Sequence, residues 1–315
     1  MAVSGSREKM NIQEMIEQKS TKSISHTMEK MVPVILFLLA SVSVLTTLGI
    51  LFTLVVETFT FFSQVSLWDF ISEKKWYPFV EASASYGVMP LVSGTLKITL
   101  IATITAVPIG LGAAIFLSEY ASDRSRRIIK PILEVLAGVP TIVYGFFALT
   151  FVTPVLQKII PELSIFNALS PGIVVGIMII PMIASLSEDA MSSVPNAMRE
   201  GALGLGSTKL EVTIKVVLPA AISGIIASIV LAVSRAIGET MIVTVAGGST
   251  PNLDWNITDS IQTMTSYIVQ VSTGDAGYGT TIYYSIYAVG FTLFMFTLVM
   301  NLLAQYISKR FREEY

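Results

Sequence analysis

Six apolar stretches, separated by polar connections, dominate the pattern of this chain. They cover about residues 33–56, 94–117, 132–156, 170–186, 218–246 and 282–306. A helix of roughly 20 apolar residues spans the ~30 Å hydrocarbon core of a bilayer. Gly138, Pro140 and Gly145 interrupt the third stretch, and Pro181 lies in the short fourth one; neighbouring helices or water can satisfy the backbone groups that such residues free. The pattern therefore predicts an all-α membrane protein with six transmembrane helices.

Positive charges indicate which side of the membrane each connection faces. Fifteen of the twenty Lys and Arg residues lie in the N-terminal tail, the second-to-third connection, the fourth-to-fifth connection and the C-terminal tail. Cytoplasmic connections are enriched in Lys and Arg, so both termini are predicted to be cytoplasmic. The first thirty residues are polar and are therefore not expected to be a cleavable signal peptide. The first apolar stretch is expected to act as an uncleaved anchor. The predicted parts are a cytoplasmic tail (1–31), a first transmembrane helix (32–57), an external segment (58–91), a five-helix core (92–306) and a cytoplasmic tail (307–315).

Composition supports this class and disfavours others. Only 13% of the 315 residues are charged and 53% are hydrophobic, whereas about a quarter of the residues in soluble proteins are charged. No basic stripe interleaved with aromatic residues points to nucleic acid. The chain has no Cys, and His26 is its single histidine, so it lacks the residues for a cysteine nucleophile, a histidine-based triad or a zinc site. We expect no catalytic residue, no metal site, no cofactor and no enzyme activity in this chain.

Three groups of side chains outside the main pattern receive structural interpretations. The aromatic residues of the external segment, such as Trp68 and Trp76, are typical of an interfacial belt; a docking surface for an external partner is the alternative. Lys97, near the outer end of the second stretch, is expected to extend its amine to the headgroups. Glu134 follows Lys130 by four residues and is expected to pair with it.

The cytoplasmic connection 188–219 predicts two short helices. Pro195 suits the first position of a helix that Gly204 and Gly206 end. Thr208 and Glu211 fit a capping box that starts a second helix running into the fifth stretch. Ala197, Met198, Ala202, Leu203 and Leu205 form an apolar surface that such a short segment cannot bury by itself. The surface is expected to enter a groove of another protein or to lie on lipid headgroups.

This connection resembles the EAA loop of ABC importer permeases. The family pattern is E-A-A, three residues, G, nine residues and I-x-L-P, and the matching positions are Glu200, Gly201, Ala202, Gly206, Val216, Leu218 and Pro219. Gly201 and Val216 depart mildly from it. The resemblance implies the type I ABC importer permease fold and a loop that couples the spans to a separate ATPase, which binds the ATP and Mg²⁺. Residues 204–209 lack the P-loop order of glycines and lysine, so the chain has no phosphate cradle of its own.

Arg235 lies inside the fifth stretch, 16 residues after Pro219, or about 24 Å along a helix. An arginine at that depth costs roughly 2.5–3.5 kcal/mol and is expected to face a cavity or a partner. Glu239 lies four residues further on, on the same helix face, where the two can neutralise each other. A structural ion pair is one interpretation. A substrate or gate role is favoured, because a guanidinium binds oxyanions bidentately and a carboxylate tolerates hydrogen phosphate better than sulfate.

Four segments resemble PstC-type phosphate permease subunits: 86–91 (YGVMPL), 108–120 (PIGLGAAIFLSEY), 138–147 (GVPTIVYGFF) and 234–241 (SRAIGETM). This resemblance implies that Arg235, Glu239 and Thr240 line a phosphate path in a bacterial plasma (inner) membrane. It also implies a second, PstA-like permease, a PstB-like ATPase dimer and an extracytoplasmic phosphate-binding protein as partners. A permease for phosphonate, molybdate or sulfate is one alternative. A stand-alone secondary anion transporter is another, but it gives no reason for the 188–219 connection.

Overall fold

The computed structural model describes residues 23–80, 83–274 and 276–310. Within the predicted tails, residues 1–22 and 311–315 therefore lie outside the described part. The chain divides into two compact units, 1–56 and 57–315. The longest helix, α2 (Ser23–Phe62), passes from the first unit into the second. Most of its apolar side chains between Met31 and Val56 are exposed, as suits a helix in contact with lipid.

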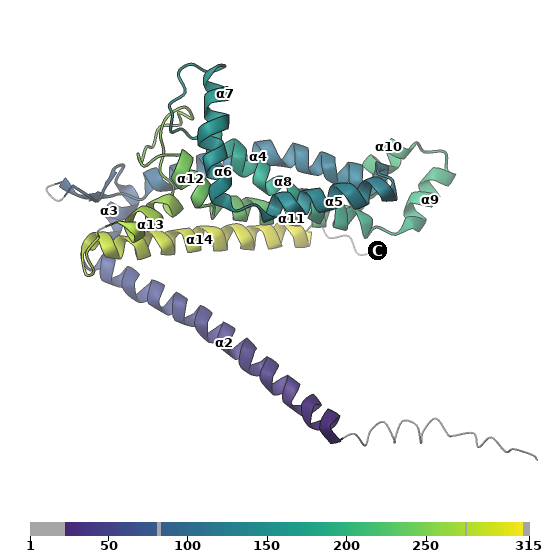
Figure 1. Ribbon diagram of the computed structural model, residues 1–315, viewed down its shortest axis with the longest axis horizontal. Helices are drawn as coiled ribbons and strands as arrows, with labels where there is room; N and C mark the ends of the chain where they lie inside the picture. The colour runs from purple at the N-terminus through teal and green to yellow at the C-terminus, as the bar shows by residue number, and fades with distance from the viewer. Residues whose placement is uncertain (1–22, 81–82, 275, 311–315) are drawn as a thin grey trace, which may run out of the picture. The chain divides into compact units, whose positions relative to one another are not determined.

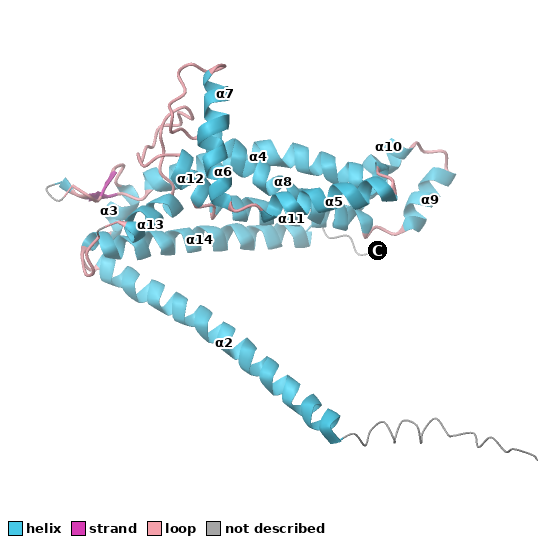
Figure 2. Cartoon of the chain, in the orientation of Figure 1, coloured by secondary structure: helices cyan, strands magenta, loops and turns pink. Residues whose placement is uncertain are grey.

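The second unit is built around long helices that run side by side (Figure 1). They are α4 (Met89–Ile115), extended by a π-helical turn to Tyr120, α8 (Leu169–Ser192), α11 (Leu218–Ile237) and α14 (Thr281–Arg310). Helical structure predominates throughout the described chain (Figure 2). In the described part, five helices are long and apolar enough to cross a membrane, and one bent pair can form a sixth span. The six predicted spans are thus found.

Helices α4 and α8 pack closely because glycines remove side chains from their contact. A Cβ on Gly172 would lie 2.7 Å from Ile101, one on Gly176 would lie 2.8 Å from Thr105, and one on Gly110 would lie 2.8 Å from Ile183. Residue numbers rise together along both helices, so α4 and α8 run parallel. The chain must return across the bundle between them, which makes the intervening bent pair a single crossing.

The bent pair consists of α5 (Asp123–Gly138) and a second arm, Thr141–Gln157, at 88° to it. The arm comprises α6 (Thr141–Phe147), the π-helical segment Ala148–Val152 and α7 (Thr153–Gln157). The sequence predicted an interrupted third span over 132–156, and the bend lies at Val139 and Pro140. A residue before proline disfavours helical backbone, and proline has no N–H to continue the ladder. Pro140 consequently starts a new helix in a new direction.

The external segment folds into a small aromatic core. It contains α3 (Leu67–Ser72) and a hairpin of β1 (Trp76–Tyr77) and β2 (Ser85–Tyr86), near α13 (Met264–Thr273). Phe61, Phe70 and Trp76 are buried, and the rings of Trp76 and Tyr267 meet edge to face at 4.8 Å. The interfacial-belt interpretation is wrong for these three side chains. Trp68, which is 74% exposed, remains available for it.

Lys97 does not extend toward the headgroups as predicted. Its side chain is buried in α4, and its amine donates hydrogen bonds to the backbone carbonyls of Asn252, at 3.4 Å, and Asp254. A buried ammonium needs such acceptors. Lys97 therefore fixes the 247–260 connection against α4.

Substitution at the α4–α8 contact tests the packing. We expect Gly176→Ala to lower the thermal stability of the detergent-solubilised chain, because its Cβ would also lie 3.0 Å from the backbone oxygen of Ala102 and overpacking costs about 1–3 kcal/mol. Gly112→Ala, on the partner helix α4 and with nothing within 4 Å of its Cβ, is the matched control. Equal melting temperatures for the two variants would contradict the described contact.

Candidate functional site

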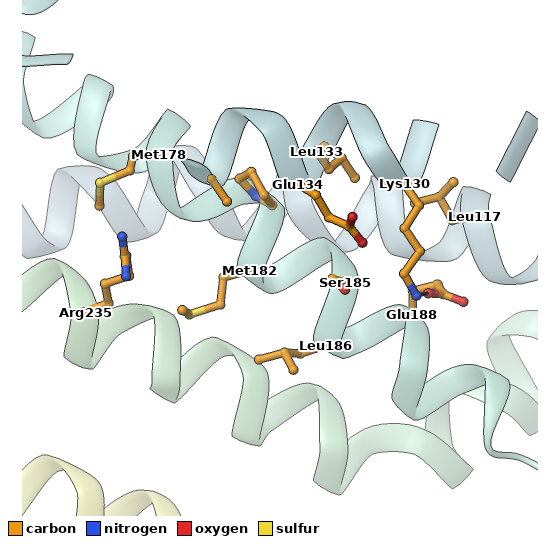
Figure 3. Close-up of a pocket in the computed structure, with 12 residues that line it drawn as sticks. Leu117, Lys130, Leu133, Glu134, Met178, Met182, Ser185, Leu186, Glu188 and Arg235 are labelled. Carbon is orange, nitrogen blue, oxygen red and sulfur yellow. Dashed lines mark hydrogen bonds and ion pairs between the residues drawn. The ribbon is translucent and has the colours of Figure 1, made fainter. Parts of the chain in front are cut away.

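Arg235 lines a cavity of about 320 Å³ between α5, α8 and α11 (Figure 3). Met178 and Met182 of α8 flank its side chain, and Lys130, Glu134, Ser185 and Glu188 line the wall further along. Arg235 is exposed and makes no hydrogen bond or ion pair within the described residues. Of the two surroundings expected for this arginine, a cavity or a partner, the structure shows a cavity. Its guanidinium is open to a ligand.

Glu239 does not pair with Arg235 within the described residues, so the ion-pair interpretation is wrong for these two side chains. Helix α11 ends at Ile237, with Gly238 as its C-cap, and a separate helix α12 (Met241–Ala246) follows. The expected fifth span over 218–246 is thus wrong at its outer end, and Glu239 is not one helical turn beyond Arg235. The Glu239 carboxylate is buried and accepts a hydrogen bond from the Ile242 N–H at 3.3 Å.

The backbone around Glu239 is also fixed. Its carbonyl accepts a hydrogen bond from the Thr265 hydroxyl at 2.7 Å, and the Thr240 hydroxyl bonds to the Gly238 carbonyl at 3.1 Å. Both polar groups of Glu239 are therefore engaged with the protein. This residue and Thr240 shape the helix break next to Arg235, and of these three residues it is Arg235 that lines the cavity.

A network of charges occupies the other end of the cavity. The fully buried Glu188 is bound by Arg126 and, at 2.9 Å, by Lys130. Lys130 also reaches Asp189 at 3.1 Å. The expected Lys130–Glu134 pair is replaced by these contacts, since Glu188 is a buried carboxylate that needs cations more than an exposed one does. Glu134 makes no hydrogen bond or ion pair within the described residues.

The connection after α8 forms two short helices, as predicted. They are α9 (Asn196–Gly204) and α10 (Lys209–Val212), and the latter continues through a π-helical segment into α11. The Thr208–Glu211 capping box is confirmed, with bonds of 3.3 and 3.0 Å. Pro195 is the residue before the helix rather than its first position. Gly206 has φ of +86°, a conformation that favours glycine.

The apolar surface of this connection is partly buried against its own chain. Met198 and Ala202 pack on a cluster that includes Met191 and Val212. Leu203 and Leu205 remain 48% and 89% exposed. Glu200 and Gly201 are also exposed, Leu218 is half-buried and Pro219 is exposed. The exposed part of the predicted coupling segment is therefore centred on Leu203 and Leu205.

Arg199 ties α9 to two spans, a role that the sequence did not indicate. Its guanidinium binds the carboxylate of Glu119 at 3.1 Å, at the end of the α4 span, and donates to the Met191 carbonyl in α8 at 2.7 Å. Both charged side chains are largely buried, with 16% and 6% exposed. Arg199 is one of many positive charges in the sequence, and Glu119 lies 80 residues earlier, so no local pattern marks them.

The chain matches the family described as "Binding-protein-dependent transport system inner membrane component" over residues 106–313. It is 32% identical over 246 residues to the probable ABC transporter permease protein YqgH of Bacillus subtilis. The alignment covers 78% of this chain and 79% of that protein. It is 33% identical over 261 residues to the phosphate transport system permease protein PstC of Mesorhizobium japonicum, covering 77% and 78%.

A solved structure has the same fold. A chain of the bacterial alginate ABC transporter in complex with an alginate-pentasaccharide-bound periplasmic protein superposes with a TM-score of 0.60, at 17% identity, over 88% of this chain and 94% of that one. The architecture is that of type I ABC importer permeases, multi-pass subunits of the inner membrane. The chain belongs to the family of binding-protein-dependent transport system inner membrane components, as a PstC-type permease.

Removing the Arg199 link should loosen α9. We expect Arg199→Ala to accelerate chymotryptic cleavage at Leu205 in the solubilised chain roughly tenfold or more, since breaking a buried ion pair costs about 3 kcal/mol. Glu119→Gln should act similarly, and the double variant should be no worse than either alone. Arg124→Ala, at an exposed position of α5, serves as control. Unchanged cleavage in Arg199→Ala would show that the link does not hold α9.

Proposed function

We propose that this chain is a transmembrane subunit of an ATP-driven phosphate importer, in which it forms the translocation path with a second, PstA-like permease. The observation that carries the proposal is the uncompensated guanidinium of Arg235 in a cavity between α5, α8 and α11. The names of the PstC relatives point to phosphate as the substrate. One of these relatives is a phosphate transport system permease protein of Pasteurella multocida, which is 38% identical over 212 residues.

The chemistry of Arg235 suits a tetrahedral oxyanion. A guanidinium offers two parallel N–H groups to a pair of anion oxygens, and it stays charged at any physiological pH. Keeping an unpaired arginine at this depth costs several kcal/mol, a cost that a binding role explains. Glu239 and Thr240 follow along the chain and hold the helix break that ends α11 beside this guanidinium. The predicted path residues Arg235, Glu239 and Thr240 thus belong to one short segment of the chain.

Energy would enter through the connection 188–219. The exposed Leu203 and Leu205 suit a groove on a PstB-like ATPase dimer, which would bind the ATP and Mg²⁺. Glu200, Gly201, Ala202 and Gly206 of the EAA pattern surround this surface, and Leu218 and Pro219 begin the helix α11 that carries Arg235. An extracytoplasmic phosphate-binding protein would deliver the anion to the opposite side.

A reconstituted complex tests this function. The chain co-purified with its permease and ATPase partners should hydrolyse ATP faster with phosphate-loaded binding protein, and should import phosphate. Arg235→Ala should reduce import at least about 100-fold, because a charge-assisted bidentate contact contributes roughly 3 kcal/mol. Arg124→Ala is the control.

Three results would contradict parts of this proposal. Import by this chain alone in liposomes, without ATP, would indicate a secondary transporter. Stimulation by sulfate, phosphonate or molybdate in place of phosphate would identify another oxyanion importer. Normal phosphate import by Arg235→Ala would remove the site assignment.

The proposed sidedness has a separate test. The chain has no Cys, so single cysteines can be introduced at exposed positions. With the chain expressed without partners, a membrane-impermeant maleimide should label Tyr278→Cys in intact spheroplasts, and Leu205→Cys only after permeabilisation. These side chains are 82% and 89% exposed. Labelling of Leu205→Cys in intact spheroplasts would place the connection 188–219 outside and defeat coupling to a cytoplasmic ATPase.

A further inference from the structure

Glu134 is a second open charge in the Arg235 cavity. It lies on α5 and lines the same 320 Å³ space, and Figure 3 shows it between Arg235 and the Lys130–Glu188 pair. Lys130, one helical turn before it, is engaged with Glu188 and Asp189 at 2.9 and 3.1 Å. Glu134 has no hydrogen-bond or ion-pair partner in the described part of the chain. The cavity thus offers one free cation and one free carboxylate.

This pairing of charges discriminates between anions. An oxyanion held by Arg235 shares this cavity with the Glu134 carboxylate, which repels negative charge unless the anion donates a hydrogen bond to it. Phosphate keeps a proton at neutral pH and can donate. Sulfate is fully deprotonated and cannot. Glu239 is unsuited to this role, because it is not among the described residues that line the cavity and its buried carboxylate is turned to the Ile242 N–H.

We propose that Glu134 is a selectivity residue of the anion site: it accepts a hydrogen bond from the hydroxyl of a protonated oxyanion bound to Arg235 and rejects oxyanions without a proton. The inference rests on the proposed function, in which Arg235 binds the transported anion. The same site would accept other tetrahedral oxyanions that keep a proton.

Competition binding tests the role directly. Line broadening of the ³¹P signal of inorganic phosphate reports weak binding to the full-length chain in nanodiscs, with sulfate as competitor. Wild-type protein should prefer phosphate about tenfold or more, as expected for one charge-assisted hydrogen bond. Glu134→Gln, whose amide can donate to sulfate, should bring the two anions within about twofold, and Glu134→Ala should also lose the preference. Glu134→Asp should keep a preference for phosphate.

Glu162→Gln, an exposed carboxylate in the connection after α7, controls for loss of charge and should behave as wild type. A wild-type preference in both Glu134→Gln and Glu134→Ala would overturn the inference. If Arg235→Ala abolishes phosphate binding at the same time, the proposed anion site stands without Glu134. If Arg235→Ala binds phosphate normally, the proposed site itself fails, whatever the Glu134 variants show.

Discussion

The close contact of α4 with α8 is the constraint on which the core depends. Three glycines, Gly110, Gly172 and Gly176, bring the two helices together where any side chain would collide with the facing residues. Small residues serve this purpose in membranes because packing, rather than a hydrophobic driving force, holds helices together there. The parallel course of α4 and α8 then requires a crossing between them, and the bent pair α5–α7 supplies it. Residues of α5, α8 and α11 line the cavity that holds Arg235.

The helix break after Ile237 decides which charges face that cavity. Had α11 continued through Glu239, the carboxylate would have stood one turn from Arg235 and neutralised it. Gly238 ends the helix, and Glu239 turns to cap α12. Lys130 likewise pairs with the fully buried Glu188, at 2.9 Å, instead of with Glu134. In the described part of the chain, the possible Arg235–Glu239 pair and the expected Lys130–Glu134 pair are both absent, and the cavity is lined by a guanidinium and a carboxylate that have no partner there. The buried carboxylates of Glu188 and Glu239 have partners, whereas the exposed Arg235 and Glu134 line the cavity.

Sequence reasoning succeeded where local patterns determine structure. Long apolar runs predicted the six spans, and the Thr208–Glu211 spacing predicted a capping box that depends only on neighbouring residues. It failed where distant residues compete. The partners of Lys130 and Arg199 lie 58 and 80 residues away, and Glu239 is held partly by Thr265 of another helix. Trp68 and Trp76 look alike as sequence, but only the second meets Tyr267 in a buried core. The sequence indicated Arg235 as a candidate site residue because an arginine inside an apolar run is costly wherever its neighbours lie.

The end of α8 joins the Arg235 cavity to the connection 188–219. Glu188 closes the cavity through Lys130 and Arg126, and Ser192, one turn later, binds both Glu188, at 3.0 Å, and Arg126, at 3.1 Å. Between them, the Met191 carbonyl receives the guanidinium of Arg199 from α9. A displacement of α9 by an ATPase would therefore pull on the same turn of α8 that holds α5 at the cavity. Because Arg199 also binds Glu119, the displacement would reach the end of the α4 span as well. On the proposed function, this single turn is where ATP-driven movement would open or close access to Arg235 and Glu134.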